Sequence, residues 1–429
     1  MKCRIGLFLA LLPFVHSGFA QAQQRDRWVA TWTTAQDLAR SQPAPPPATP
    51  ATPPATPPAS TPAPPIPPGR RGFNNQTVRM IVHTSIGGSR VRIKLASAFG
   101  AAPVTVGAAH IALRSKDSEI VPESDRALTF NGKPGCTIND GMVLMSDPVD
   151  LKVPGLSDLA VSLYLPGESG RPTSHGSALH TNYISKEGDF TGAAAIADAA
   201  TSESYVWLAG VDVLAPPDAG LIVALGDSIT DGIRSTTDSN HSWPALLAAR
   251  LAARGDTANI AVGNMGISGN KVLRDGAGVS AVARFDRDVL SQSGVKWVML
   301  LEGINDIGTG RPTEPVTVDE ITGAFRQMIE EAHTHGIQAI GCTLTPFLGA
   351  PYKREAGEPI RVEVNKWIRT SGAFDAVVDF DAAVRDPADP TKVRAEFDPG
   401  DHLHPNDKGY QALADAVDLA IFSGKRAAR

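Results

Sequence analysis

The chain has 429 residues, of which 42% are hydrophobic and 20% are charged, and its formal net charge is −5. Single hydrophobic cores stop growing beyond about 250–300 residues, so a chain of this length favours two domains. A net negative charge gives no attraction to phosphate backbones or to anionic lipid headgroups. The composition therefore argues against nucleic acid and membrane surfaces as partners.

The first 22 residues have the pattern of an export signal. Lys2 and Arg4 form a positively charged start, residues 5–15 are an apolar segment too short to span a bilayer, and residues 20–22 give a small-x-small cleavage site. No later stretch is long enough to cross a membrane. We therefore expect a secreted or periplasmic protein without integral membrane association.

Short strand patterns separated by turn residues fill residues 26–212. Residues 27–34 are rich in aromatic and β-branched side chains, and apolar and basic residues alternate over 90–95, which gives one buried and one charged strand face. Gly87-Gly88 is expected to join this second strand to one at 78–84 as a hairpin. With almost no helical periodicity, the region is predicted to be an all-β sandwich domain.

A Pro/Ala/Thr tract at residues 42–69 interrupts the strand pattern. Such a segment lacks backbone donors and large apolar side chains, so it is predicted to be extended and disordered. Because strand-like sequence lies on both sides of it, we expect an insertion within the β domain rather than a linker between domains.

Two cysteines, Cys136 and Cys342, would remain after removal of the signal, one in each half of the chain. An oxidising compartment permits a disulfide, but their sequence positions do not establish that they are close. Two separate buried thiols are expected, and pairing is left open.

Residues 219–423 alternate strand and helix patterns, which predicts an α/β domain with a parallel sheet between two layers of helices. The strands are expected at 221–225, 259–262, 295–301, 337–344 and 376–380. The helices are expected at 244–254, 279–290, 318–335, 359–370 and 406–421. In such a fold the loops at the carboxyl ends of the strands hold the site.

Residues suited to acyl transfer follow these strands or precede the last helix. Ser228 comes directly after the first strand, and a serine hydroxyl becomes a good nucleophile only when a base takes its proton. His404 is the candidate base, and Asp401, three positions earlier, would orient its ring. The backbone N–H groups of Ser228 and Gly269 and the side-chain amide of Asn305 are candidate donors to an oxyanion.

Four stretches of the chain resemble the four blocks of the SGNH (GDSL-type) hydrolase family. They are Gly226-Asp227-Ser228, Asn-Met-Gly-Ile-Ser-Gly ending at Gly269, Gly-Ile-Asn-Asp containing Asn305, and Asp401-x-x-His404-Pro. The resemblance implies a three-layer, flavodoxin-like parallel sheet. It also implies that Ser228 is the nucleophile, His404 the base and Asp401 its partner, with Ser228, Gly269 and Asn305 forming the oxyanion hole. The N-terminal half resembles the β-rich domain of many secreted bacterial members.

Alternatives to the main site assignment remain open. His402 could serve as the base in place of His404, and Asp398 is a second candidate for orienting it. Gly266 could replace Gly269 as the oxyanion donor, since both are expected on the same loop.

Other polar residues have weaker functional interpretations. The pairs His402-x-His404 and His333-x-His335 have metal-ligand spacing. The first pair is assigned to catalysis. The second lies at the C-terminal end of a helix, where an imidazole interacts favourably with the helix dipole. No metal or cofactor is therefore expected.

Four further residues are assigned structural roles. Asp227 and Asp306 are expected to stabilise loops rather than to act as acids. His175 and His180 are expected to be structural, with a place in the substrate cleft as the alternative.

The expected function is that of a secreted serine esterase that hydrolyses short-chain carboxylic esters through an acyl-enzyme. Export and an extra β-domain point to O-acetyl groups on carbohydrate as the substrate, either a small molecule or a polysaccharide. A lipid esterase or lysophospholipase is the alternative among hydrolases, and acyl transfer to a sugar is also open. A glycan-binding protein with an idle hydrolase domain is the alternative of another class, which the intact set of four motifs disfavours.

Overall fold

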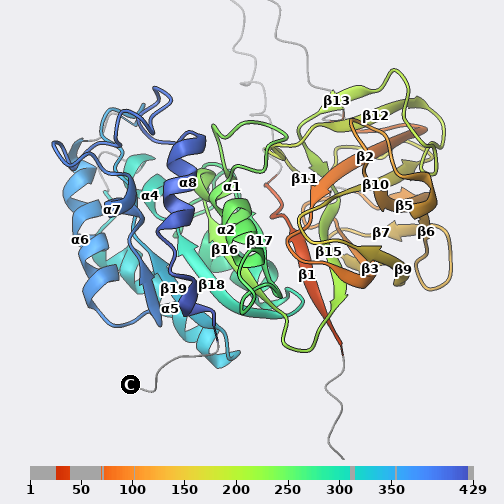
Figure 1. Ribbon diagram of the computed structural model, residues 1–429. Coiled ribbons are helices and arrows are strands. Elements are labelled where there is room, and N and C mark those ends of the chain that lie inside the picture. The colour runs from red at the N-terminus through yellow and green to blue at the C-terminus, as the bar shows by residue number, and fades with distance from the viewer. Residues whose placement is uncertain are drawn as a thin grey trace, which may run out of the picture.

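The computed structural model describes residues 26–38, 69, 72–100, 102–309, 315–352 and 355–423. The expected export signal lies outside the described residues, as does all of the expected Pro-rich insertion except Gly69. Within the described residues, a β-rich N-terminal region lies beside an α/β C-terminal region (Figure 1).

A five-stranded parallel sheet forms the centre of the C-terminal region, in the order β17-β16-β18-β19-β20. The strands are β16 (Gly220–Gly226), β17 (Ile260–Gly266), β18 (Val295–Leu301), β19 (Gln338–Cys342) and β20 (Ala376–Val378). Every residue of β16 is buried, because this strand has a neighbour on each side and helices over both faces. The strand order is the flavodoxin-like one, so the predicted fold class is confirmed.

Helices cover both faces of this sheet (Figure 1). On one face α2 (Trp243–Ala252) packs against α8 (Asp407–Asp415), and on the other α5 (Val318–Thr334) packs against α3 (Ala281–Phe285) and α6 (Glu358–Thr370). The remaining helical elements are short. They are α1 (Ser228–Asp231), a π-helical turn (Asp286–Leu290), α4 (Ile304–Thr309), α7 (Phe380–Val384) and 3₁₀ turns at Pro122–Ser124, Glu355–Gly357 and Leu419–Ile421.

A capping box fixes the start of α5: the Thr317 hydroxyl accepts from the Glu320 N–H, and the Glu320 carboxylate accepts from the Thr317 N–H. The last helix is shorter than predicted, since α8 ends at Asp415 and a 3₁₀ turn replaces the expected continuation. Trp243 and Trp297 are buried in the core of this region.

The N-terminal region consists mostly of antiparallel sheets. One sheet contains β1 (Arg27–Thr33), β15 (Leu208–Ala215), β3 (Gly88–Ala96), β8 (Val143–Met145) and β9 (Val149–Val153). The other has the order β13-β12-β2-β10-β5-β6, with bounds Ala200–Ser202, Asn182–Glu187, Gln76–His83, Asp158–Leu165, Ala108–Leu113 and Arg126–Leu128. Two small pairs join β4 (Val104–Val106) to β7 (Cys136–Ile138) and β11 (Ser174–His175) to β14 (Tyr205–Val206).

The expected hairpin through Gly87-Gly88 is wrong, because β2 and β3 belong to different sheets. Both edges of β2 are already occupied, by β10 and β12, so β3 has no free edge to pair with. The glycines instead allow close packing: a Cβ at Gly88 would lie 2.7 Å from the Leu214 carbonyl oxygen. Gly87-Gly88 is a dipeptide typical of turns, but in this protein it lies where the chain crosses from one sheet to the other.

The N-terminal and C-terminal regions share one continuous hydrophobic core. Strand β1 lies against β17, the edge strand of the parallel sheet (Figure 1). Hydrogen bonds cross this contact: Ala30 N–H donates to the Ser293 carbonyl at 2.9 Å, and the Thr33 hydroxyl donates to the Asn264 carbonyl at 3.3 Å. We propose that the boundary between the two domains lies at residues 212–219 and that the two domains meet over a buried interface.

Among the described residues, no helix has the length and apolar character needed to cross a membrane. Cys136 and Cys342 are free thiols, as expected; Cys342 is buried, whereas Cys136 is only half-buried. Burial raises the pKa of Cys136 to about 11, so this thiol is protonated at neutral pH.

Candidate active site

Ser228, His404 and Asp401 form a hydrogen-bonded chain. His404 Nε2 lies 2.8 Å from Ser228 Oγ, and His404 Nδ1 lies 2.9 Å from Asp401 Oδ2. The sequence separates Ser228 from His404 by 176 positions, and the fold brings them together because the loop before α8 reaches the carboxyl end of β16. The arrangement can take a proton from the serine hydroxyl and hold the resulting imidazolium beside a carboxylate.

Asp401 is held as a carboxylate by its hydrogen bonds. Its Oδ1 accepts from the backbone N–H groups of Leu403 and His404, and its Oδ2 accepts from the Arg234 Nε–H at 2.9 Å in addition to the His404 ring. Burial opposes ionisation, but these donors outweigh it and hold the pKa of Asp401 well below its usual range. Arg234 lies outside the four motifs, so the sequence analysis did not identify it.

The alternative base, His402, does not face Ser228. Its Nδ1 contacts Asp398 Oδ2, so His402 and Asp398 form a separate pair on the same loop. His402 also adopts a positive φ of 58°, a backbone conformation that turns the chain between this pair and His404.

A tight turn presents Ser228 at the end of β16. Asp227 caps α1, its Oδ1 accepting from Ile229 N–H at 3.0 Å, and Ser228 is the first residue of that helix. The helix ends after one turn at Gly232, whose φ of 107° favours glycine. Ser228 therefore lies where backbone N–H groups point out of the helix and can stabilise negative charge.

The two other candidate oxyanion donors flank Ser228. Gly226 pairs with Gly266 in β17 and with Leu301 in β18, so the loops after both neighbouring strands emerge beside the serine. Gly269 lies on the first loop, with a φ of +80°, and Asn305 is the second residue of α4, directly after the second loop.

Gly266 is not a free donor. Its N–H donates to Asn264 Oδ1 at 2.9 Å, and a Cβ at this position would lie 2.2 Å from the Asp231 nitrogen. A close contact with α1 therefore accounts for this glycine, and Gly269 remains the candidate.

Tyr352 orients the amide of Asn305, and nothing in the sequence identified this contact. Its hydroxyl donates to Asn305 Oδ1 at 2.6 Å, which fixes which end of the amide faces the site. Asn305 Nδ2 is buried and has no hydrogen-bond partner among the described residues. The tyrosine ring packs over Gly308, where a Cβ would lie 2.4 Å from the ring. A buried donor without an acceptor is what an oxyanion site requires.

Replacing Tyr352 by Phe should lower kcat about tenfold with little change in KM, because the Asn305 amide loses the bond that orients it. Steady-state kinetics on p-nitrophenyl acetate measure kcat and KM separately. Asn305→Ala, which removes the donor itself, should cost about 10²–10³ in kcat. Equal kcat for wild type and Tyr352→Phe would contradict the positioning role.

A buried charge cluster lies beneath the serine. The Arg284 guanidinium donates to the Gly226 carbonyl at 3.0 Å and to Asp288 at 2.9 Å, and lies 3.5 Å from Glu302. Burial raises the pKa of Asp227 to about 7 and the pKa of Glu302 well above its usual range. Asp306 accepts from the backbone N–H groups of the loop at 272–273. Asp227 and Asp306 therefore make loop-stabilising contacts, as the sequence analysis expected.

His175 joins the N-terminal region to the site through Asp231. Its Nε2 lies 3.1 Å from Asp231 Oδ1, while Asp231 Oδ2 accepts from the Ser268 hydroxyl at 2.6 Å and from Ser268 N–H at 3.1 Å. Ser268 precedes Gly269, so this chain of contacts holds the segment between β17 and α3 that carries the candidate oxyanion donor. We call this segment, residues 267–280, the oxyanion loop. Burial of the imidazole lowers its pKa, but the carboxylates of Asp231 and Asp37 outweigh burial and raise the pKa of His175 to about 9.

His175 should therefore be charged at neutral pH. Because its pKa is raised on folding, its contribution to stability is fully present below about pH 6.5, the pKa of an unfolded histidine, and is lost as the pH rises through about 9. Wild type should lose about 3 kcal/mol of unfolding free energy over this interval relative to His175→Gln. Urea denaturation across this pH range measures the difference, and parallel curves would contradict a charged His175.

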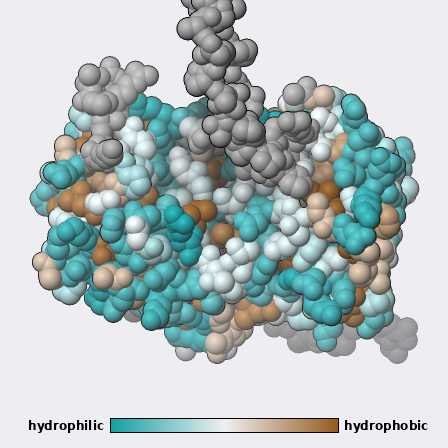
Figure 2. Space-filling model, turned by 90° about the horizontal axis from the view of Figure 1, so that it is seen from above, coloured by the Kyte–Doolittle hydropathy of each residue, from teal (hydrophilic) through white to brown (hydrophobic). Residues whose placement is uncertain are grey.

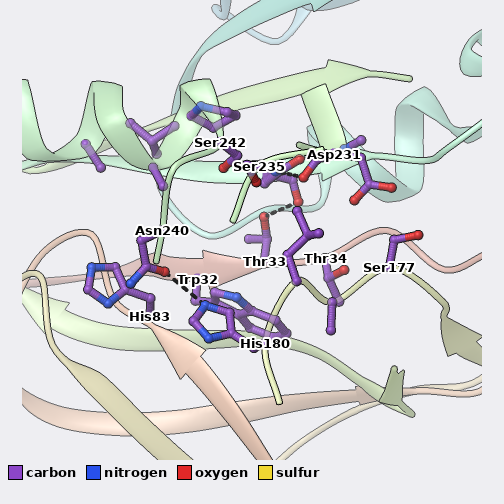
Figure 3. Close-up of a pocket in the computed structure, with 18 of the residues that line it drawn as sticks. Trp32, Thr33, Thr34, His83, Ser177, His180, Asp231, Ser235, Asn240 and Ser242 are labelled. Carbon is purple, nitrogen blue, oxygen red and sulfur yellow. Dashed lines mark hydrogen bonds between the residues drawn. The ribbon is translucent and has the colours of Figure 1, made fainter. Parts of the chain in front are cut away.

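Histidines of the N-terminal region also border a cavity of about 100 Å³ between the two regions (Figure 3). His180 Nε2 lies 2.9 Å from Asn240 Oδ1 across this cavity, and His175 and Asp231 line it as well. Both histidines thus make structural contacts, with Asp231 and Asn240, and both also line this cavity.

The histidine pairs considered as metal ligands have other contacts. His333 Nε2 lies 2.8 Å from Asp375 Oδ2, and His335 Nδ1 donates to the Glu331 carbonyl. In the described part of the chain, no group of three or more His, Cys, Asp or Glu side chains is arranged to hold a metal ion.

Comparison with known proteins gives the family of the C-terminal region. Residues 224–412 match the profile described as the GDSL-like Lipase/Acylhydrolase family. Similar solved structures include a variant of Axe2, an acetyl xylan esterase from Geobacillus stearothermophilus, with 24% identity over 49% of this chain and 99% of that one and a TM-score of 0.38.

Two further structures are similar over about half of this chain. LAE5, an α/β hydrolase enzyme from the metagenome of Lake Arreo, Spain, is 25% identical over 47% of this chain and 95% of that one, with a TM-score of 0.36. A GDSL-like lipase from Bacteroides thetaiotaomicron is 19% identical over 47% of this chain and 87% of that one, with a TM-score of 0.35. No curated protein sequence matches the chain. The resemblance inferred from the four motifs is confirmed: residues 224–412 form a domain of the GDSL-like lipase/acylhydrolase family.

Proposed function

We propose that this protein is an exported serine esterase that hydrolyses short-chain carboxylic esters through an acyl-enzyme. The observation that carries the proposal is the contact series from Ser228 Oγ through His404 to Asp401, at 2.8 and 2.9 Å. Each group has the chemistry that its place requires: a hydroxyl, a base and an acceptor for the second ring nitrogen.

In the first half-reaction, Ser228 Oγ attacks the ester carbonyl carbon while His404 Nε2 takes the serine proton. The carbonyl oxygen becomes an oxyanion that accepts from the N–H groups of Ser228 and Gly269 and from the Asn305 amide. As the tetrahedral intermediate collapses, the bond to the alcohol oxygen breaks, and His404 returns the proton to that oxygen.

In the second half-reaction, water attacks the acyl group on Ser228 and gives its proton to His404. Collapse of this intermediate breaks the bond between the carbonyl carbon and Ser228 Oγ, which takes the proton back, and releases the carboxylic acid. Asp401 stays a carboxylate throughout and stabilises the imidazolium.

We propose O-acetyl groups on carbohydrate as the substrate class. The expected export signal supports an extracellular substrate. On the face seen in Figure 2, hydrophobic residues are scattered in small groups among hydrophilic ones, which suits a hydrated substrate better than a lipid aggregate.

A panel of esters tests this function. We expect kcat/KM to fall at least tenfold from p-nitrophenyl acetate to p-nitrophenyl octanoate, and acetate to be released from acetylated xylotetraose. A preference for lysophospholipid or long-chain esters by orders of magnitude would favour the lipid esterase alternative. Binding of the saccharide without turnover of any ester would favour the glycan-binding alternative. Formation of an acetylated sugar when free saccharide is added would indicate acyl transfer.

A further inference from the structure

A second cavity, of about 310 Å³, opens in the N-terminal region next to the oxyanion loop. Its walls come from β12, β13 and β14, from the segment after β1 and from residues 171–177. The volume is at the lower end of the range for ligand pockets, about 300–1,000 Å³. It has room for a small part of a ligand and not for a long chain.

Two residues of the oxyanion loop complete the wall of this cavity. They are Ser268, which directly precedes Gly269, and Ala277, whose Cβ lies 3.4 Å from where a Cβ of Gly269 would be. The N-terminal region binds this loop directly, because Leu38 N–H donates to the Ala277 carbonyl at 2.9 Å. Gly269, the candidate oxyanion donor, thus lies next to two residues of the cavity wall.

The side chains around the cavity are mixed in a way that suits a sugar. Hydroxyl groups come from Ser174, Ser202 and Ser204, and one carboxylate and one guanidinium, from Asp37 and Arg171, offset each other in charge. Hydroxyl and charged groups of both signs can exchange hydrogen bonds with a neutral polyol.

Part of the cavity lining is apolar. Phe73, Ile184 and Val206 contribute to it, and the Phe73 ring lies 5.7 Å from the ring of Trp207. Sugar rings present both C–H faces and hydroxyl edges, so a lining that combines apolar side chains with hydroxyl groups complements them.

We propose that this cavity binds the saccharide that carries the ester, that is, the alcohol portion that leaves when Ser228 is acylated. The N-terminal β region would then supply the substrate specificity of a site whose chemistry is in the C-terminal domain. This inference rests on the proposed esterase function and names the part of the substrate that the β region recognises.

Filling the cavity tests the proposal. Ser202 is half-buried and lines the cavity, whereas its neighbour Thr201 is exposed on the same strand and is absent from the lining. Ser202→Trp should lower the ratio of kcat/KM for acetylated xylotetraose to that for p-nitrophenyl acetate at least tenfold. Thr201→Trp, the matched control, should leave this ratio unchanged. Thermal melting of each variant establishes that it is folded.

Inhibition of the wild type by the free saccharide does not depend on any variant folding. Unacetylated xylotetraose should inhibit hydrolysis of p-nitrophenyl acetate competitively in wild type, and absence of this inhibition would overturn the proposal. In folded Ser202→Trp the inhibition should weaken at least tenfold. An unchanged ratio with unchanged inhibition would overturn the proposal. A variant that instead changes the preference for butyrate over acetate would place the acyl group in the cavity and would also overturn it.

Failure of the proposed function has a different signature. If wild type and Ser228→Ala hydrolyse p-nitrophenyl acetate equally, the esterase mechanism is wrong. If wild type is active on that ester, Ser228→Ala is not, and Ser202→Trp leaves the ratio intact, only the role of the cavity is wrong.

Discussion

Ser228→Ala should lower kcat for p-nitrophenyl acetate about 10⁶-fold, because removal of a serine nucleophile from a preorganised triad leaves only the contribution of the oxyanion donors. The structure makes this substitution a clean test. Ser228 Oγ has His404 as its hydrogen-bond partner, and the side chain otherwise lies at the start of α1, where alanine fits a helix well. Stability should therefore change little while turnover is lost.

Steady-state kinetics combined with a thermal melt measure the two effects. Ser239→Ala, in the loop between α1 and α2, is a matched control that should retain wild-type kcat. A residual rate for Ser228→Ala within tenfold of wild type would show that a different group attacks the ester.

Asp401→Asn should lower kcat about 10⁴-fold, the size of effect seen when the wrong histidine tautomer is imposed on a triad. Each Asp401 oxygen now accepts from two donors: Oδ1 from two backbone N–H groups, and Oδ2 from the His404 ring and Arg234. An amide has one accepting end only.

The backbone donors cannot move away, whereas Arg234 is 58% exposed at its side chain and can turn into solvent. The asparagine oxygen should therefore stay at the Oδ1 position and its NH₂ group should face His404 Nδ1. That contact makes Nδ1 an acceptor and places the proton on Nε2, which can then no longer accept from Ser228.

Arg234→Gln is the informative control for this prediction. It removes one donor to Asp401 and leaves the tautomer of His404 unchanged, so kcat should fall less than tenfold. The pH dependence of kcat/KM for all three proteins separates loss of the tautomer from loss of charge. A 10⁴-fold loss in Arg234→Gln, or a small one in Asp401→Asn, would contradict this account of the Asp401 contacts.

The C-terminal fold could be predicted from the sequence because its signals are local. The buried run ending at Gly226 and the amphipathic helix capped at Thr317 need no long-range information. The pairing of Ser228 with His404 was predictable only from the order of the four motifs, since no periodicity relates positions 176 residues apart.

The N-terminal sheets were less predictable because pairing partners are set by tertiary contacts. Strand β15 lies between β1 and β3, yet the sequence analysis did not identify it. Almost all residues of β15 are buried, so the alternation typical of a half-exposed strand is missing. Its one charged residue, Asp212, is paired to Arg92. The expected hairpin at Gly87-Gly88 was wrong for a related reason, since glycines serve close packing as well as turns.

Residues that position the site also left no signal in the sequence. Tyr352 reaches Asn305 from the loop after β19, and His175 reaches Asp231 from the other region of the chain. Tyr352 and His175 belong to none of the four motifs and contact residues far away in the sequence. Only the three-dimensional structure reveals these contacts.

Covalent labelling tests the central claim most directly. Brief exposure to an excess of an aryl phosphonate ester, followed by intact-protein and peptide mass spectrometry, should add one phosphonyl group per chain, on the peptide that contains Ser228. The same treatment should leave Ser228→Ala unmodified, and Asp401→Asn should label far more slowly than wild type. Stoichiometric labelling of Ser228→Ala, or labelling of wild type at another residue, would contradict the assignment of Ser228 as the nucleophile.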